Sequence, residues 1–335
     1  MAFAYQLTAA GADQVKRVEV DEIEPAAGEI KIRMRASSMN YHDLSVLLGF
    51  MPNMQYPRVP MSDGCGEIVA VGEGVSSFSV GDRAMPMFFP DWRSGRPTTD
   101  VKRRVLGDTV DGCLQEYFCV EAGAAVKAPG HMSDAEAATM VCAGLTAWYP
   151  LMEEFGITDQ HTVLLQGTGG VSLAGLLIAK AVGARVAITS SSDEKLARCE
   201  SLGADYLVNY NTHKDWHKEV YRQTGGVDIT LDNGGQHTLG MAAKCTRDDG
   251  FIAIIGVLSG YESAAIPFID VMQKNMTIKG VTVGCAESGD RYARFAEQHA
   301  LKPVISHTLA AGQLEEAVAL MGAGGHFGKI AIAID

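Results

Sequence analysis

The sequence lacks several features that would each indicate a particular class of protein. Basic residues are outnumbered, 28 Lys and Arg against 40 Asp and Glu, and the net charge of −12 argues against nucleic acid or an anionic membrane as a partner. The chain opens on MAFAYQLTAAGADQ, which has neither a basic segment nor an apolar run and does not resemble a signal peptide. The most apolar stretch, residues 171–188, is interrupted by Lys180, Gly183 and Arg185 and is too short to span a membrane.

Cysteines are few and widely spaced. The seven stand at positions 65, 113, 119, 142, 199, 245 and 285, and no two of them form a Cys-x-x-Cys pair. This spacing argues against a disulfide framework and against a zinc site built from thiolate pairs. We expect reduced cysteines, packed as small apolar side chains, in a cytoplasmic protein.

The composition that remains is that of a globular chain, and two kinds of pattern divide it. With 335 residues, 47% of them hydrophobic, two domains are expected. Up to about residue 125, short strand-like runs separated by Gly, Pro and Asp predict a β-barrel-like domain. These runs are Ile30–Ala36, Gly66–Val71, Asp82–Met87 and Gln115–Val120, with a polar loop over 90–109.

From about residue 130, strand-like runs alternate with amphipathic helical stretches. This alternation predicts an α/β domain with a doubly wound parallel sheet covered on both faces, and six strands fit a Rossmann domain. The predicted strands are Thr162–Gln166, Arg185–Thr189, Tyr206–Val208, Val227–Leu231, Phe251–Ile255 and Met276–Val283. The predicted helices are Ser172–Val182, Asp193–Leu202, Lys214–Gln223 and His237–Cys245, and a last strand is expected over Ile330–Ile334.

A glycine-rich turn follows the first of these strands. TVLLQ runs directly into GTGGVS, in which Gly167, Gly169, Gly170 and Val171 precede a predicted helix and Ser172 takes the place of a third glycine. Backbone N–H groups at the start of a helix bind phosphate, and the strand–turn–helix context makes a dinucleotide the expected ligand.

The end of the second strand distinguishes the two nicotinamide dinucleotides. An acidic residue there would bind the ribose hydroxyls of NAD, whereas this sequence has Ser190, Ser191 and Lys195, which suit the 2′-phosphate of NADP. Asp193 complicates this interpretation, although it or Ser192 is expected to cap the next helix. NADP(H) is therefore favoured, and NAD(H) stays possible.

Several ordered motifs give the chain a resemblance to a known family. NYHDL at 40–44, PMSDGCGEIVAVG at 60–72, VGDR at 80–83, CAGLTAW at 142–148, the GTGGVS turn and the terminal HFGK are similar to the medium-chain dehydrogenase/reductase superfamily, near its zinc-free alcohol dehydrogenase-like and quinone oxidoreductase-like branch. The resemblance implies a Rossmann domain over 129–299 inserted into a GroES-like β-barrel of residues 1–128 and 300–335. It also implies a homodimer paired through the last Rossmann strand.

The departures from that family concern zinc. Where zinc-dependent relatives use Cys, a His-Glu pair and a further Cys or Asp, this chain has Asn40, Ser62, Asp63 and Cys142. Amides and hydroxyls are poor zinc ligands, so no metal is expected. Ser62, Asp63 and Cys142 then become residues of the substrate pocket.

Without a metal, hydrogen-bond donors must stabilise an oxyanion. The resemblance places Asn40, Tyr41 and His42 beside the nicotinamide as catalytic candidates, with Asp43 supporting the segment. On the cofactor side it implies Thr146 at the nicotinamide, Val257 and Val283 at its ribose, Tyr210 at the 2′-phosphate and Lys329 facing the cofactor, or else a solvated turn.

The expected function is an NADP(H)-dependent, zinc-free oxidoreductase that acts on a small carbonyl or alcohol. An NADPH-dependent quinone or enone reductase is the alternative, because conjugated acceptors need little electrophilic help. A non-catalytic NADPH-binding sensor is a third hypothesis.

Overall fold

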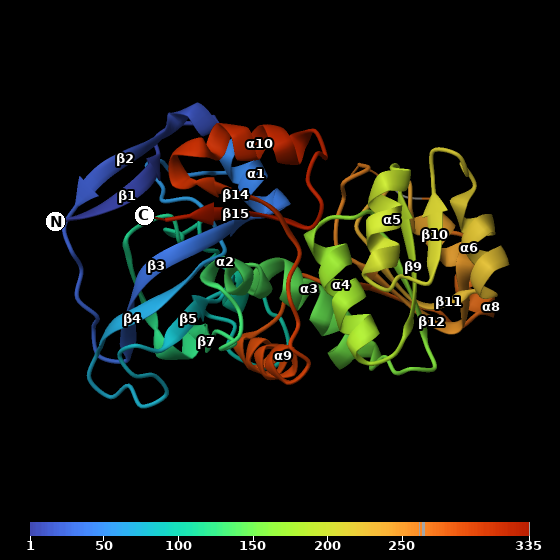
Figure 1. Ribbon diagram of the computed structural model, residues 1–335, viewed down its shortest axis with the longest axis horizontal. Helices are drawn as coiled ribbons and strands as arrows, with labels where there is room; N and C mark the ends of the chain where they lie inside the picture. The colour runs from blue at the N-terminus through green and yellow to red at the C-terminus, as the bar shows by residue number, and fades with distance from the viewer. Residues whose placement is uncertain (261, 263–264, 335) are drawn as a thin grey trace. The chain divides into compact units, whose positions relative to one another are not determined.

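A computed structural model describes residues 1–260, 262 and 265–334. The chain divides into two compact units, one of Met1–Leu145 with Val283–Asp335 and the other of Thr146–Thr282, here called unit 1 and unit 2. Figure 1 shows that the first and last parts of the chain, blue and red, belong to the same unit.

Unit 1 is built on a seven-stranded sheet of order β14-β15-β3-β4-β5-β7, with β6 paired to β3, and a separate hairpin β1-β2. Its strands are β1 Ala2–Leu7, β2 Val15–Val20, β3 Glu29–Met39, β4 Cys65–Val71, β5 Arg83–Pro86, β6 Tyr117–Glu121, β7 Ala125–Lys127, β14 Ile305–Ala310 and β15 Lys329–Ala333. Its helices are α1 Tyr41–Leu47, α2 Asp134–Ala138, α9 Ala286–Gln298 and α10 Leu314–Gly322, with a π-helical turn at Met140–Gly144. Apolar residues of β1, β3, β4, α1, α10 and β15 form one core.

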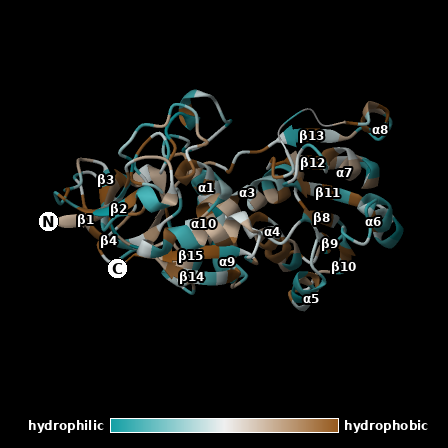
Figure 2. Ribbon diagram, turned by 90° about the horizontal axis from the view of Figure 1, so that it is seen from above, coloured by the Kyte–Doolittle hydropathy of each residue, from teal (hydrophilic) through white to brown (hydrophobic). Residues whose placement is uncertain are grey.

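Unit 2 is a parallel sheet of order β10-β9-β8-β11-β12-β13. Its strands are β8 Thr162–Gln166, β9 Arg185–Ser190, β10 Tyr206–Asn209, β11 Val227–Asp232, β12 Thr246–Ile254 and β13 Thr277–Gly280. Its helices are α3 Leu145–Trp148, whose first residue lies in unit 1, α4 Gly170–Ala181, α5 Asp193–Ser201, α6 Trp216–Thr224, α7 Leu239–Cys245 and α8 Phe268–Gln273, with a π-helical turn at Tyr149–Phe155. Figure 2 shows α4 and α6 on opposite sides of the strands.

The alternating side chains of this sheet explain why helices cover both faces. Leu164, Ala187, Val208 and Ile252 pack with α6 and α7 in one apolar cluster. Val163, Leu165 and Val186, which precede or follow two of them along the strands, are also fully buried. Strands that are apolar at every position are typical of a parallel sheet between two helical layers.

The predicted α/β fold is confirmed, and most strands lie within a few residues of their expected bounds. β12 begins earlier than expected, at Thr246, and β13 is shorter. The closure of the barrel by the last strand is also confirmed, because β15 pairs with β3 antiparallel, Ile330 opposite Met39. Among the described residues no helix is long and apolar enough to cross a membrane.

The bounds of the two units differ from the expected domain bounds at 129 and 299. Residues 129–145 and 283–299 belong to unit 1. The physical reason is packing, because α2 contacts β3, β4 and β15 and α9 contacts β7, all elements of unit 1. A change of sequence pattern marks where helices begin, and these two helices serve the barrel.

Candidate functional site

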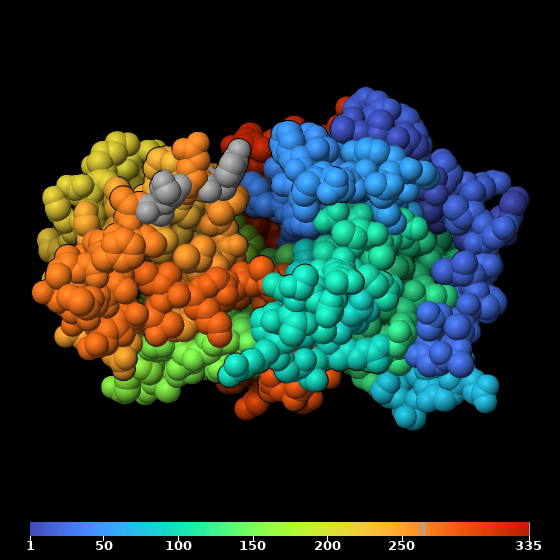
Figure 3. Space-filling model, turned by 180° about the vertical axis from the view of Figure 1, so that it is seen from behind, coloured from blue at the N-terminus to red at the C-terminus, as the bar shows by residue number. Residues whose placement is uncertain are grey.

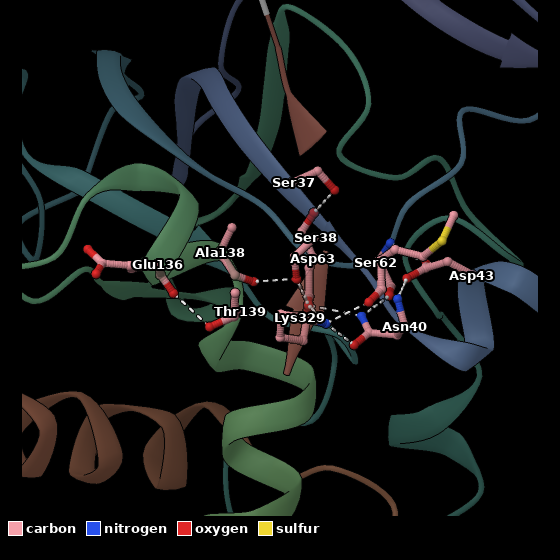
Figure 4. A network of polar contacts seen from close by, with 11 residues as sticks. Ser37, Ser38, Asn40, Asp43, Ser62, Asp63, Glu136, Ala138, Thr139 and Lys329 are labelled. Atoms are coloured by element: carbon pink, nitrogen blue, oxygen red, sulfur yellow. Dashed lines mark hydrogen bonds and ion pairs between the residues drawn. The ribbon is translucent and has the colours of Figure 1, made fainter. Parts of the chain in front are cut away.

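Unit 1 contains a group of polar side chains buried between β3, α1 and β15 (Figure 4). We call it the polar cluster, and it consists of Ser38, Asn40, Asp43, Ser62, Asp63 and Lys329, each at most 8% exposed. Burying polar groups is costly unless they are hydrogen-bonded. The cluster therefore implies a dense set of internal hydrogen bonds, and the structure has them.

The amino end of α1 supplies two members of the cluster. Strand β3 ends at Met39, and Asn40 is the N-cap of α1, with Asp43 at its third position. The Asp43 carboxylate accepts hydrogen bonds from the backbone N–H of Asn40, 2.8 Å, and of Ser62, also 2.8 Å. Asp43 therefore ties the start of α1 to the Ser62–Asp63 segment, in agreement with its expected supporting role.

Ser62 and Asp63 follow a strained turn. The preceding residue, Met61, has a φ of 74°, a left-handed conformation that is uncommon outside glycine, and its side chain is fully buried. Gly112 packs so closely on this turn that a Cβ atom there would lie 2.2 Å from the Met61 carbonyl oxygen. Strained residues persist where the surrounding structure restrains them, and the close packing of Gly112 is one such restraint.

Lys329 is the cation of the polar cluster. Its ammonium group donates to the carbonyl oxygen of Met39 at 2.8 Å and to the side-chain oxygen of Asn40, and it lies 3.3 Å from Asp63 Oδ2. Because Lys329 begins β15 and is 5% exposed, it does not lie in a solvated turn, which was the simpler sequence interpretation. Its expected role toward the cofactor stays a prediction.

Asp63 is the anion that faces this ammonium. Its Oδ2 accepts from the Ser38 hydroxyl at 2.6 Å and from the Asn40 amide at 2.9 Å, whereas its Oδ1 is buried and finds no hydrogen-bond partner among the described residues. Burial raises the pKa of Asp63, and the positive charge of Lys329 opposes that rise. Burial likewise raises the pKa of Asp43.

The side chains at the positions where zinc-dependent relatives have their metal ligands are poorly suited to zinc. The Asn40 oxygen and the Asp63 Oδ2 both contact the Lys329 ammonium. Burial, with the negative charge of Asp63, raises the pKa of the Cys142 thiol well above its usual range. Zinc binds thiolates, neutral imidazoles and carboxylates, and a neighbouring ammonium repels it. Over residues 1–260, 262 and 265–334, no three His, Cys, Asp or Glu side chains come together as a metal site.

Tyr41 and His42 occupy the first turn of α1 and differ in exposure. Tyr41 is 40% exposed, and partial burial raises the pKa of its phenol. His42 Nε2 lies 3.5 Å from Asp108 Oδ2, and its ring packs edge-on against Phe88. Burial lowers the pKa of His42, and the charge of Asp108 partly opposes this. His42 is thus neutral at neutral pH, and Tyr41 keeps its proton well into the alkaline range.

The glycine-rich turn of unit 2 is predicted to bind the phosphates of a dinucleotide, and we call it the phosphate cradle. Gly167 has a φ of 77°, a conformation that glycine adopts without strain, and Gly169 is the N-cap of α4. The first backbone N–H groups of a helix have no partner within it, so those of Gly170 and Val171 are available to an anion. Ser172 is buried and donates its hydroxyl to the carbonyl oxygen of Gln166 at 2.8 Å, as expected for a residue that holds helix against strand.

The end of β9 contains the residues expected to distinguish NADP from NAD. Ser192, and not Asp193, is the N-cap of α5, because its hydroxyl accepts from the backbone N–H of Lys195 at 3.2 Å. Ser190 is buried, and its hydroxyl accepts from the backbone N–H of Ser192. Ser191 is exposed, Lys195 is half-buried, and Tyr210, beyond β10, is 38% exposed.

Asp193 is restrained by a residue that sequence reasoning missed. The side-chain amide of Asn209, at the end of β10, donates to the Asp193 carboxylate at 2.6 Å. A carboxylate at the first position of a helix is also stabilised by the helix dipole. Asp193 therefore has a structural role next to the serines.

The remaining predicted residues are divided between the two units. Thr146 and Val257 lie in unit 2, the first buried and the second exposed. Cys142, in a π-helical turn, and Val283 lie in unit 1. Val283 has a φ of 56°, a strained conformation for a β-branched residue and one that clusters at functional sites.

Sequence reasoning also missed Ser38 and Asp108. Ser38 lies two residues beyond the predicted strand Ile30–Ala36, and Asp108 lies in a polar loop, so neither belongs to a motif. Only the fold brings them to Asp63 and His42.

Comparison with known protein families assigns each half of the chain. Residues 26–130 match the model described as alcohol dehydrogenase GroES-like domain, and residues 170–300 match the model described as zinc-binding dehydrogenase. A zinc-type alcohol dehydrogenase-like protein of Schizosaccharomyces pombe is 36% identical over 97% of this chain and 96% of its own. An acryloyl-coenzyme A reductase of Metallosphaera sedula is 28% identical over 93% of this chain and 94% of its own.

Solved structures agree over the full length. A putative alcohol dehydrogenase from Sinorhizobium meliloti is 38% identical, with a TM-score of 0.92 over 99% of this chain and 98% of its own. A structure titled NAD-dependent alcohol dehydrogenase is 33% identical, with a TM-score of 0.89 over 99% of this chain and 100% of its own.

Proposed function

Since this chain belongs to the medium-chain dehydrogenase/reductase superfamily and is an alcohol dehydrogenase-like oxidoreductase, we propose that it uses NADP(H), without zinc, to transfer hydride to or from a small carbonyl or alcohol. The observation that carries the proposal is the turn from β8 into α4, with its left-handed Gly167 and the free N–H groups that follow. Such a turn binds the pyrophosphate of a dinucleotide and places no demand on a metal.

The preference for NADP(H) is supported by the side chains after β9. The exposed Ser191 hydroxyl and the Lys195 ammonium can bond a 2′-phosphate, and the exposed Tyr210 can pack against it. An NAD-specific site instead uses a free carboxylate on the ribose hydroxyls, whereas Asp193 here is bonded by Asn209. One similar structure is titled NAD-dependent, so cofactor choice is tested directly below.

The zinc-free mechanism is supported by the chemistry of unit 1. The raised pKa of the Cys142 thiol and the contacts of Asp63 and Asn40 with the Lys329 ammonium do not favour a zinc donor set, which supports the proposal. The developing oxyanion then needs a hydrogen-bond donor. Tyr41 is the stronger candidate because it is partly exposed and keeps its proton at neutral pH, while His42 is neutral there.

Reduction of a conjugated alkene or quinone is the second candidate. A relative over nearly the whole chain is named acryloyl-coenzyme A reductase, and acryloyl groups are conjugated with a carbonyl. In such acceptors the negative charge delocalises, so weaker electrophilic assistance suffices. A polar cluster without a metal fits this reaction as well.

The proposed assembly is a homodimer in which two copies pair at β13. This strand lies at the edge of its sheet, paired with β12 alone in the described part of the chain. The neighbouring α8 exposes Phe268, Ile269 and Met272, and Figure 3 shows α8 and β13, orange, at the surface of unit 2. An exposed strand edge beside exposed apolar side chains is typical of an interface.

The test of the proposed function is NADPH consumption with a panel of aldehydes, ketones, enones and quinones, with product identification. Alcohol products support carbonyl reduction. Saturated ketones or hydroquinones as products support the second candidate, reduction of a conjugated alkene or quinone. NADPH binding without consumption of any acceptor supports the non-catalytic sensor, and stoichiometric zinc in the purified protein would overturn the zinc-free mechanism.

A further inference from the structure

The Lys329 ammonium is buried, and it contacts three oxygen atoms of the protein. We propose that Lys329 is a positioning residue: its ammonium is the cation of the polar cluster, where it fixes Asn40 and Asp63 and thereby the first turn of α1. This proposal rests on the zinc-free mechanism, because it assigns the positive charge of the cluster to Lys329 and not to a bound zinc ion.

The first argument is the number of bonds. An ammonium has three N–H donors, and Lys329 contacts three oxygens, those of Met39, Asn40 and Asp63. With all three donors used inside the protein, the ammonium has none left for a phosphate or a substrate. Its contacts join the start of β15 to the end of β3 and the start of α1.

The second argument is the orientation of Asn40. Its side-chain oxygen accepts from Lys329, and its side-chain nitrogen donates to Asp63 at 2.9 Å. An amide held at both ends has one orientation. Since Asn40 is the N-cap of α1, the same contacts fix the residues that follow it, Tyr41 and His42.

The third argument is charge balance. Asp63 is completely buried, and the ionisable groups that face it are Lys329, Asp43 and the thiols of Cys113 and Cys142. Burial raises the pKa of both thiols well above their usual range, so they carry no charge. Lys329 is therefore the positive charge paired with Asp63, and removal of one partner of a buried ion pair is strongly destabilising.

The experiment is a double-variant cycle followed by urea unfolding between pH 8 and pH 5.5. K329M keeps the approximate length of the side chain and removes its charge, which leaves the buried Asp63 carboxyl without the positive charge that faces it. We expect the unfolding equilibrium constant to rise by about a hundredfold or more, as for other broken buried ion pairs. In K329M the pKa of Asp63 rises further above its value in the unfolded chain, so folding takes up a proton. The difference in stability between K329M and the wild type therefore becomes smaller as the pH falls. We expect the ratio of their unfolding equilibrium constants to be about tenfold or more smaller at pH 5.5 than at pH 8.

The double variant K329M/D63N removes both charges, and we expect it to be more stable at pH 8 than K329M alone. K31M is the matched control. Lys31 is also buried and paired with carboxylates, but Glu22 and Glu24 are exposed, so water solvates their carboxylates without it. The difference in stability between K31M and the wild type should therefore be the same at pH 5.5 as at pH 8.

Activity separates this role from a contact with the cofactor. K329M should lower kcat while the Kd of NADPH changes less than about threefold. A loss of stability that is independent of pH, a double variant no more stable than K329M, or a selective loss of NADPH affinity would each overturn the proposal. If K329M does not fold at pH 8, folding of the double variant supports the proposal and its failure to fold contradicts it. None of the stability outcomes depends on whether the enzyme acts on carbonyls or enones.

Discussion

At the scale of single residues, one phosphate distinguishes NADPH from NADH, and Lys195 is the cation proposed to bind it. We predict that K195E raises the Kd of NADPH about tenfold to a hundredfold and changes the Kd of NADH less than about threefold. The reason is that a carboxylate replaces a charge-assisted hydrogen bond by repulsion of a phosphate, and each tenfold corresponds to about 1.4 kcal/mol.

The matched control is K244E, at an exposed lysine in the last turn of α7. It makes the same change in net charge at the amino ends of the strands, opposite the edge where β9 ends, so both affinities should stay as in the wild type. Fluorescence titration with each cofactor measures them. Equal losses for NADPH and NADH in K195E would remove the basis of the NADP assignment.

The proton donor can also be identified from single residues, because the two candidates titrate in opposite directions from their usual values. Burial raises the pKa of Tyr41, so as a donor it would keep kcat constant from pH 6 to about 9. Burial lowers the pKa of His42, so as a donor it would make kcat for reduction rise as the pH falls below about 6.5, its usual pKa.

We predict the first profile, and a loss of about a hundredfold in kcat for Tyr41→Phe, within the usual range for general acid catalysis. His42→Asn is the companion variant and should cost less than about tenfold. If neither variant lowers kcat, the proton comes from solvent and Tyr41 is not catalytic.

At the scale of elements, the phosphate cradle depends on the conformation of Gly167. A Cβ atom at this position meets no atom within 4 Å, so a substitution changes only the backbone energy. We predict that Gly167→Ala lowers the free energy of unfolding by about 1–2 kcal/mol, the cost of a left-handed conformation for alanine. It should also weaken cofactor binding, because the turn relaxes away from the pyrophosphate.

The control for this prediction is Gly312→Ala, since Gly312 has the same open surroundings without a left-handed φ. Urea unfolding and NADPH titration measure the two effects. A Gly167→Ala protein as stable as wild type, with full cofactor affinity, would mean that the turn is not strained by a side chain.

The same elements show what could be predicted from the sequence. β8 was predicted at its observed bounds, and α4 and α5 within two residues, because their apolar spacing and caps are local signals. The glycine-rich turn between β8 and α4 was likewise located from a local motif, and its ligand stays a prediction. Lys329 was named from the FGK motif as a residue facing the cofactor or else a solvated turn. Its buried contacts were not foreseen, because its partners Met39 and Asn40 are about 290 positions earlier in the chain. A contact of that kind depends on β15 pairing with β3 and leaves no periodic pattern.

The bounds of the units were less predictable for a related reason. α9 is amphipathic whichever unit it covers, and only its contacts with β7 assign it to the barrel. Sequence pattern therefore establishes that a helix exists and gives its buried face, whereas its partner is decided by packing.

At the scale of the whole molecule, the proposed dimer predicts that charge on α8 separates the two copies. Phe268 is 80% exposed and Met272 is 67% exposed, one turn apart on the helix that precedes β13. An aspartate in place of either residue would remove the apolar area that the dimer buries, which is worth about 25 cal/mol per Å². Two carboxylates in their place would also be repelled by the two on the symmetry-related copy, because a two-fold interface brings the same patch together.

We predict that F268D/M272D is monomeric at micromolar concentration, where the wild type is a dimer, as measured by size-exclusion chromatography with light scattering. F50D/V80D is the matched control, since Phe50 and Val80 are comparably exposed in unit 1, 74% and 62%. It should stay dimeric. A monomeric wild type, or a control that dissociates as readily, would show that β13 and α8 are not the interface, and their exposed apolar side chains would then need another partner.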